Sequence, residues 1–134
     1  MSVQLPDETL LRWLWLSFIC APGSLSGDKL FGRFGHDIYA IHGAGEEDYR
    51  AVEGLAPALI PALCEKDLTE AKQVLAWCKN EKVGVLTPDH PMFPPRLMKI
   101  HASPVLLYVK GKLPEIEDNV CVAMVGTRSM TEYG

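Results

Sequence analysis

Residues 120–129 read Val-Cys-Val-Ala-Met-Val-Gly-Thr-Arg-Ser, and this stretch decides the fold class that the sequence predicts. The unbroken apolar run from Val120 to Val125 predicts a β-strand that is covered on both faces, as strands of parallel sheets are. Gly126 then allows a ligand to approach the backbone closely where the strand ends. A helix that starts after it would present unpaired backbone N–H groups, which favour anions. The stretch therefore predicts an α/β sheet with a ligand-binding turn at its edge.

Polar side chains follow this glycine. Arg128 offers a planar cation that can hold a phosphate through two donors, and Ser129 and Thr131 add hydroxyl groups. The pattern is neither the G-x-G-x-x-G of dinucleotide-binding folds nor a Walker loop. On spacing alone, a phosphate site and an ordinary strand-to-helix turn with a surface arginine are equally good interpretations.

The character of the sequence changes near residue 80. Before it, apolar residues recur at three- and four-residue spacing over 10–19 and 71–78, which predicts amphipathic helices. After it, apolar runs at 83–87 and 105–109 predict strands, and a proline-rich segment between them cannot be a regular helix or a central strand. We therefore expect a small all-α unit over 5–79 and an α/β unit over 80–134.

A parallel strand needs neighbours that are joined to it through crossovers of a dozen or more residues. No crossover can follow residues 120–125, because the sequence ends at Gly134. We therefore expect this sequence to be a fragment of a longer protein, or another chain to complete the sheet.

Composition excludes several classes of protein. The chain has 134 residues, of which 48% are hydrophobic and 22% charged, the balance of a soluble globular protein. No apolar run approaches the ~20 residues that a membrane span needs. No basic region precedes the first apolar stretch, which argues against a secretory signal. The four cysteines are widely spaced among apolar residues, which favours reduced, buried thiols in a cytoplasmic protein (Cys20, Cys64, Cys78 and Cys121).

The charge is unevenly distributed. The net charge of −4 lies entirely in residues 1–79, whereas residues 80–134 carry six basic and six acidic side chains. A phosphate-bearing ligand is therefore repelled less by the second part of the chain.

Three passages together resemble the DprA/Smf family of DNA-processing proteins. The first is Trp-Leu-Trp-Leu-Ser at 13–17, which runs into Ala-Pro-Gly at 21–23. The second is Asp-His-Pro-Met-Phe-Pro-Pro-Arg-Leu at 89–97, which leads to Val-Leu-Leu-Tyr-Val-Lys-Gly at 105–111. The third is Val-Ala-Met-Val-Gly-Thr-Arg at 122–128, which closes in Thr-Glu-Tyr-Gly at 131–134. The order and spacing of the last two are specific to this family, and the likeness covers the front part of a family member.

The resemblance implies a sterile-alpha-motif-like (SAM-like) helical domain over 5–79 and the beginning of a Rossmann-like domain over 80–134. It implies a cytoplasmic protein that binds single-stranded DNA during natural transformation, helps to load the RecA recombinase and forms a homodimer. It implies DNA-phosphate contacts from Gly126, Thr127, Arg128 and Ser129. It implies no enzymatic activity, no cofactor and no membrane partner.

Two other functions stay open at the level of the sequence. Rossmann-like nucleotide hydrolases of the lysine-decarboxylase-like type resemble the strand–Gly–x–Arg opening, and there the turn would hold a nucleotide phosphate. Alternatively, the acidic helical part alone serves as a protein-interaction module. The Pro22-Gly23 turn invites a helix-hairpin-helix interpretation, but a second, closely spaced glycine is missing, so a tight turn in a helical module is favoured.

Other candidate residues favour structural roles. His36 and His42 lack a third ligand nearby, so we expect no metal site. Asp89-His90 is expected to cap a loop, and Ser129 has neither the G-x-S-x-G setting nor an evident base, so we expect no catalytic residue. We expect core packing for the tryptophans and loop anchoring for Phe93, with base stacking as the alternative for Phe93, Tyr108 and Tyr133 (tryptophans Trp13, Trp15 and Trp77).

Overall fold

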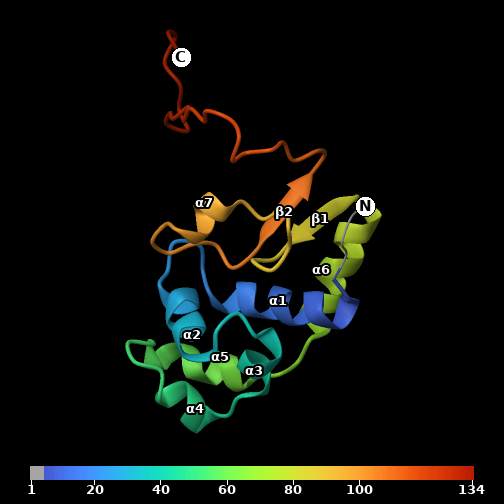
Figure 1. Ribbon diagram of the computed structural model, residues 1–134, viewed down its shortest axis with the longest axis vertical. Helices are drawn as coiled ribbons and strands as arrows, with labels where there is room; N and C mark the ends of the chain where they lie inside the picture. Colours follow the sequence, from blue (N-terminus) through green and yellow to red (C-terminus); the bar gives the residue numbers. More distant parts are fainter. Residues whose placement is uncertain (1–4) are drawn as a thin grey trace.

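Helix α1, Asp7–Ile19, lies in the middle of the folded part, as the computed structural model of residues 5–134 shows (Figure 1). Four short helices lie on one side of it and a two-stranded sheet lies on the other. The further elements are α2 (Ser26–Phe34), α3 (Ile38–Gly43), α4 (Glu46–Arg50), η1 (Pro57–Leu59), α5 (Ile60–Cys64), α6 (Thr69–Asn80), β1 (Val83–Leu86), α7 (Pro95–Met98) and β2 (Leu107–Lys110). The described residues thus form a mixed α+β structure.

Helix α1 is central because it is apolar on several faces. Trp13, Leu14 and Leu16 are completely buried. The indole of Trp15 packs in the core and donates a hydrogen bond from Nε1 to the carbonyl of Glu65 at 2.8 Å, so its polar atom has a partner. The turn after α1 contains Gly23 at φ +81°, a conformation that glycine adopts without strain.

Helices α2 to α5 are short, and local sequence signals explain where several of them begin. Asp37 caps α3, where its carboxylate accepts hydrogen bonds from the N–H groups of Tyr39 and Ala40, each at 3.1 Å. Pro57 and Pro61 lie in the first turns of η1 and α5, where the missing N–H does no harm. Each proline thus lies near the start of a short helical element rather than inside a longer one.

Helix α6 buries one face against α1. Ala71, Leu75 and Cys78 are buried at the expected helical spacing. Trp77 lies outside this buried face and is 57% exposed, so the prediction that all three tryptophans lie in the core is wrong for this one. The reason is periodicity, because the position next to buried Cys78 points about 100° away around the helix.

The sheet pairs β1 with β2 in antiparallel orientation, with Val83 opposite Lys110 and Leu86 opposite Leu107. The two strands confirm the β-type runs that the sequence predicts near 83 and 105. Between them, the proline-rich segment forms turns and the single turn of α7. Phe93 is 3% exposed and anchors this segment, as expected.

The residues before β2 pack directly on the helical part. Val105 and Leu106 belong to the same apolar core as α1 and α2. Gly27 of α2 approaches Val105 so closely that a Cβ on the glycine would lie 2.8 Å from Val105 Cγ1. The carboxylate of Asp28 accepts a hydrogen bond from the N–H of Ala102 at 3.0 Å. These contacts join the segments 5–79 and 80–134. The division of the chain into two domains at residue 80 stays a prediction.

The apolar run 120–125 is not a strand in the structure. Its backbone pairs with neither β1 nor β2, and Val120, Val122, Met124 and Val125 are 87–100% exposed. The expectation of a strand covered on both faces is therefore wrong for the described residues, because no neighbouring strand or helix accompanies it. The C-terminal end of the chain instead lies away from the folded part (Figure 1).

The helices and the cysteines bear on two further expectations. None of the described helices is long and apolar enough to cross a membrane. All four cysteines are free thiols, but only Cys20 and Cys78 are buried, whereas Cys64 and Cys121 are exposed. The expectation of buried thiols is thus wrong for two of them: Cys64 is the last residue of the short helix α5, and Cys121 lies on the exposed chain after β2.

Candidate nucleic-acid interface

Residues Gly126 to Ser129 lie on the exposed chain beyond the sheet. No atom of another residue approaches within 4 Å of where a Cβ on Gly126 would stand. The hydroxyl of Thr127 donates to the carbonyl of Ser129 at 2.6 Å, which makes a local turn around Arg128. No helix follows Gly126 within the described residues, so the expected helix N-terminus is not part of this site.

Arg128 is exposed, and among residues 5–134 no carboxylate forms an ion pair with it. Its guanidinium is thus not committed to an internal acid. The turn therefore offers the guanidinium of Arg128 and the hydroxyl group of Ser129 as donors to a ligand in solution, because the Thr127 hydroxyl already donates within the turn. An anion with several oxygens suits such a set of donors.

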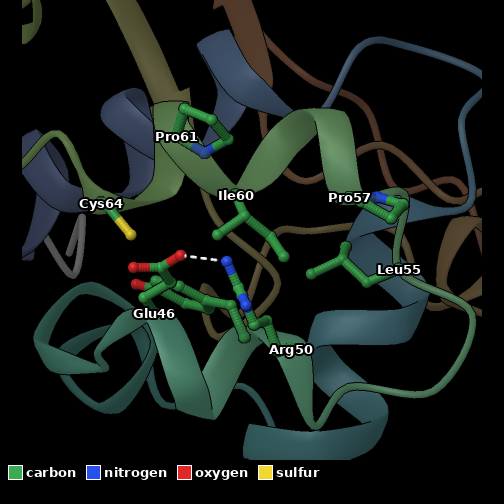
Figure 2. A pocket seen from close by; sticks show the side chains of 8 residues that line it. Glu46, Arg50, Leu55, Pro57, Ile60, Pro61 and Cys64 are labelled. Carbon is green, nitrogen blue, oxygen red and sulfur yellow. Dashed lines mark hydrogen bonds and ion pairs between the residues drawn. The ribbon is translucent and has the colours of Figure 1, made fainter.

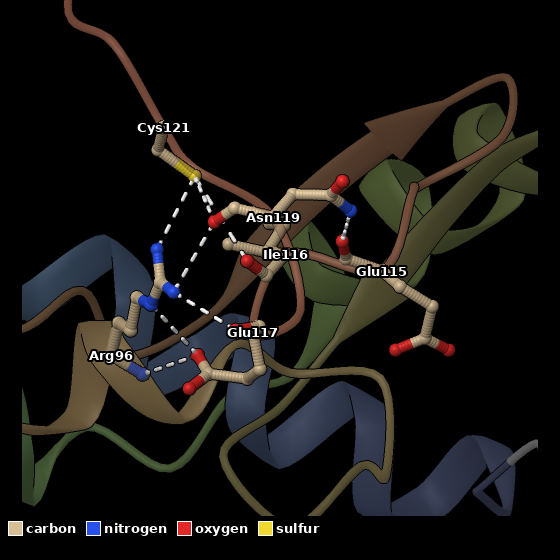
Figure 3. A network of polar contacts seen from close by, with 6 residues as sticks. All are labelled: Arg96, Glu115, Ile116, Glu117, Asn119 and Cys121. Carbon is tan, nitrogen blue, oxygen red and sulfur yellow. Dashed lines mark hydrogen bonds and ion pairs between the residues drawn. The ribbon is translucent and has the colours of Figure 1, made fainter.

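Arg96 is the functional candidate that the sequence analysis did not assign. It begins α7 together with Pro95, and its guanidinium reaches the chain that follows β2 (Figure 3). Nε lies 3.5 Å from a carboxylate oxygen of Glu117, and Nη2 donates to the carbonyls of Glu117 at 3.0 Å and Asn119 at 3.3 Å. Nη1 contacts Sγ of Cys121 at 3.4 Å, and the backbone N–H of Arg96 donates to the Glu117 carboxylate at 3.2 Å.

We call this set of contacts, between Arg96 and Glu117, Asn119 and Cys121, the Arg96 clasp. It joins residues that lie more than twenty positions apart. The available signal in the sequence was an arginine in a proline-rich segment followed, after β2, by an acid-rich stretch at 115–118. That signal does not show which acid Arg96 contacts, because the contact forms only after the chain between them has folded back through β2.

Basic side chains gather at one end of the sheet. Val83 pairs with Lys110, so Lys82, which directly precedes β1, and Lys110, the last residue of β2, lie at the same end of the sheet. Both are exposed, as is Lys112. Lys112 lines a groove of about 480 Å³ together with Lys79, whose ammonium forms an ion pair with Asp7 at 2.5 Å. This end of the sheet therefore carries an excess of positive charge, although the whole chain is acidic.

A second cavity, of about 560 Å³, lies between α4 and α5. Figure 2 shows the ion pair of Glu46 and Arg50 inside a wall of Leu55, Pro57, Ile60 and Pro61, with Cys64 at its edge. Glu46 and Arg50 are four residues apart on α4, so each neutralises the charge of the other.

Beside this cavity, Tyr49 is buried and its hydroxyl donates to the carbonyl of Ile41. Lys66 donates to the same hydroxyl at 2.5 Å, and its ammonium lies over the rings of Tyr49 and Trp15. Burial raises the pKa of Tyr49 to about 12 and lowers the pKa of Lys66. These contacts fix α4 to the core, which is a structural role.

The histidines also have structural partners. His36 stacks on Phe31 with ring centroids 4.5 Å apart, and His42 packs edge-on against Trp15 at 4.8 Å. Burial lowers the pKa of His42. Nδ1 of His90 accepts from the N–H of Met92 at 3.0 Å, which confirms the expected loop-capping role. No group of three metal-ligating side chains occurs within residues 5–134.

Comparison with known proteins places the second part of the chain in context. Residues 84–134 match the sequence profile of a family of recombination mediators. The family is DNA recombination-mediator protein A, and the match supports the resemblance seen in the sequence. It includes the proline-rich segment, β2, the partners of Arg96 and the turn at 126–129, whereas α1 to α6 lie outside it. No curated protein and no solved structure matches the chain.

Proposed function

We propose that this chain belongs to the DNA recombination-mediator protein A family and binds single-stranded DNA through Gly126, Thr127, Arg128 and Ser129. The single observation that carries the proposal is the family match over 84–134, which includes this turn. Within the described residues, the exposed guanidinium and the neighbouring hydroxyl group of Ser129 support it chemically. The proposed activity is binding without catalysis, as the family resemblance implies.

The binding is expected to be electrostatic and independent of base sequence, because phosphate contacts carry no sequence information. One arginine supplies one phosphate contact, and useful affinity takes several. Lys82, Lys110 and Lys112 at the end of the sheet are the further contacts that we propose. The positive charges of these lysines offset the repulsion between DNA and the acidic helical part.

The finer points of this proposal follow from the family resemblance. In the cytoplasm of its host, the protein would deliver single-stranded DNA to the RecA recombinase and act as a homodimer. The helical part over 5–79 would be a SAM-like module, and residues 80–134 would begin a Rossmann-like domain.

The test measures the affinity of the 134-residue chain for a fluorescent oligothymidylate by anisotropy over a series of salt concentrations. Arg128→Ala should weaken binding and reduce the magnitude of the slope of log K against log salt by about 0.7, the contribution of one phosphate on a single strand. Arg33→Ala is the matched control, because it removes the same charge from an exposed position on α2. Equal slopes for both variants and the parent chain would contradict the assigned role.

A further inference from the structure

The Arg96 clasp fixes the chain between β2 and the turn at 126–129. Arg96 and Glu117 have side chains that are 44% and 41% exposed, so their ion pair alone contributes little stability. The clasp is stronger than a simple pair because the guanidinium also donates to two backbone carbonyls (Figure 3). Planar, divergent donors make this possible, and a lysine ammonium does not reproduce them.

We propose that Arg96 is a positioning residue for DNA binding: it anchors residues 117–121 so that Arg128 engages the same strand of DNA as the lysines of the sheet. This inference rests on the proposed function. Arg96 is not proposed to contact DNA, because its donors are occupied by Glu117, Asn119 and Cys121.

Chain length gives the size of the effect. Arg128 lies eighteen residues beyond the end of β2 at Lys110, but only seven residues beyond Cys121, the last residue of the clasp. For a flexible chain the end-to-end distance grows as about 5–6 Å times the square root of the residue number. Opening the clasp therefore increases the reach of Arg128 from about 15 Å to about 23 Å.

The larger reach lowers the effective concentration of Arg128 near DNA that is bound to the lysines. The effective concentration of a tethered contact falls roughly as the −3/2 power of the tether length, which gives about a fourfold loss here. The dissociation constant for single-stranded DNA should rise by about this factor when the clasp is opened. The number of phosphates contacted stays the same, so the salt dependence should not change.

Glu117 provides the decisive variant, because its charge and its position predict opposite results. If Glu117 acts only as a negative charge, Glu117→Ala tightens DNA binding by relieving repulsion. If it acts through the clasp, the same substitution weakens binding. Asp118→Ala is the matched control: it removes the same charge from the next residue, which forms no ion pair within the described chain.

The experiment compares Arg96→Ala, Glu117→Ala and Asp118→Ala in the 134-residue chain. Hydrogen exchange of the peptide around 113–125, measured without DNA, reports the clasp itself and should accelerate in the first two variants only. Anisotropy with oligothymidylate should then show about a fourfold weaker affinity for Arg96→Ala, and a smaller loss for Glu117→Ala because it keeps the two carbonyl bonds, with an unchanged salt slope in both.

Three results would overturn the inference. A salt slope that falls by about 0.7 in Arg96→Ala would show a direct phosphate contact. Tighter binding in Glu117→Ala, equal to that in Asp118→Ala, would show a purely electrostatic role. Faster exchange without any change in affinity would show a clasp that is only structural. Failure of the proposed function is recognised separately, since Arg128→Ala would then leave the salt slope of the parent chain unchanged.

Discussion

The contact between Gly27 and Val105 makes a sharp prediction about how the helical part and the sheet are joined. Gly27→Ala adds a Cβ that would lie 2.8 Å from Val105 Cγ1. Carbon atoms in favourable contact are about 3.5–4.0 Å apart, so one of the two segments must move. Val105 is buried and its branched side chain has few alternative rotamers, so it cannot turn aside easily.

The magnitude follows from two opposing effects. Overpacking a filled site costs about 1–3 kcal/mol. Replacing glycine by alanine in a helix gains up to about 1 kcal/mol. The net result for Gly27→Ala is therefore a loss of up to about 2 kcal/mol in the free energy of unfolding.

Gly32→Ala is the matched control in the same helix. No atom lies within 4 Å of a Cβ at this position, so the substitution should stabilise the chain by about 0.5–1 kcal/mol. Urea unfolding, followed by far-ultraviolet circular dichroism, measures both variants. Introducing Val105→Ala should then remove most of the penalty of Gly27→Ala, as a double-mutant cycle would report. If the two glycine variants are equally stable, the packing of α2 against Val105 described above is refuted.

Two predictions concern the same core. Ala102 has φ +56°, a strained conformation for a residue with a side chain, so Ala102→Gly should raise the free energy of unfolding by about 0.5–1 kcal/mol in urea melts; a loss of stability would refute the strain. Burial raises the pKa of Cys20 from 9.0 to about 12 and that of Tyr49 from 10.0 to about 12. Because the folded state holds both groups in their neutral forms, stability is complete below pH 9 and should fall between pH 9 and about 12. Cys20→Ala should flatten the first part of that fall in a pH series of unfolding curves, and an unchanged curve would refute the assignment.

The helices could be predicted from the sequence because their signals are local. The spacing of the apolar residues on α1 and α6, and the prolines at 57 and 61, act within a few positions of the chain. The two paired strands were also indicated by short apolar runs. The family match over 84–134 supports the resemblance that was based on the proline-rich segment and the Gly-Thr-Arg turn.

The remaining features depend on which segments meet in space. An apolar run such as 120–125 predicts a strand, but a strand forms only where neighbours supply hydrogen-bond partners, and residues 5–134 supply none. The exposure of Trp77 depends on which face of α6 meets α1. The Arg96 clasp requires β2 to bring residue 117 back to α7, and no local pattern encodes that return. The predicted role of Arg128 stays a prediction.

The exposed run from Val120 to Val125 has a practical consequence for the isolated chain. Six uncharged residues without proline, open to solvent, form the kind of segment that stacks into cross-β aggregates. Glu117, Asp118 and Arg128 flank it and act as gatekeepers through charge repulsion between stacked copies. High salt screens that repulsion, so concentrated samples of these 134 residues will keep best at low ionic strength.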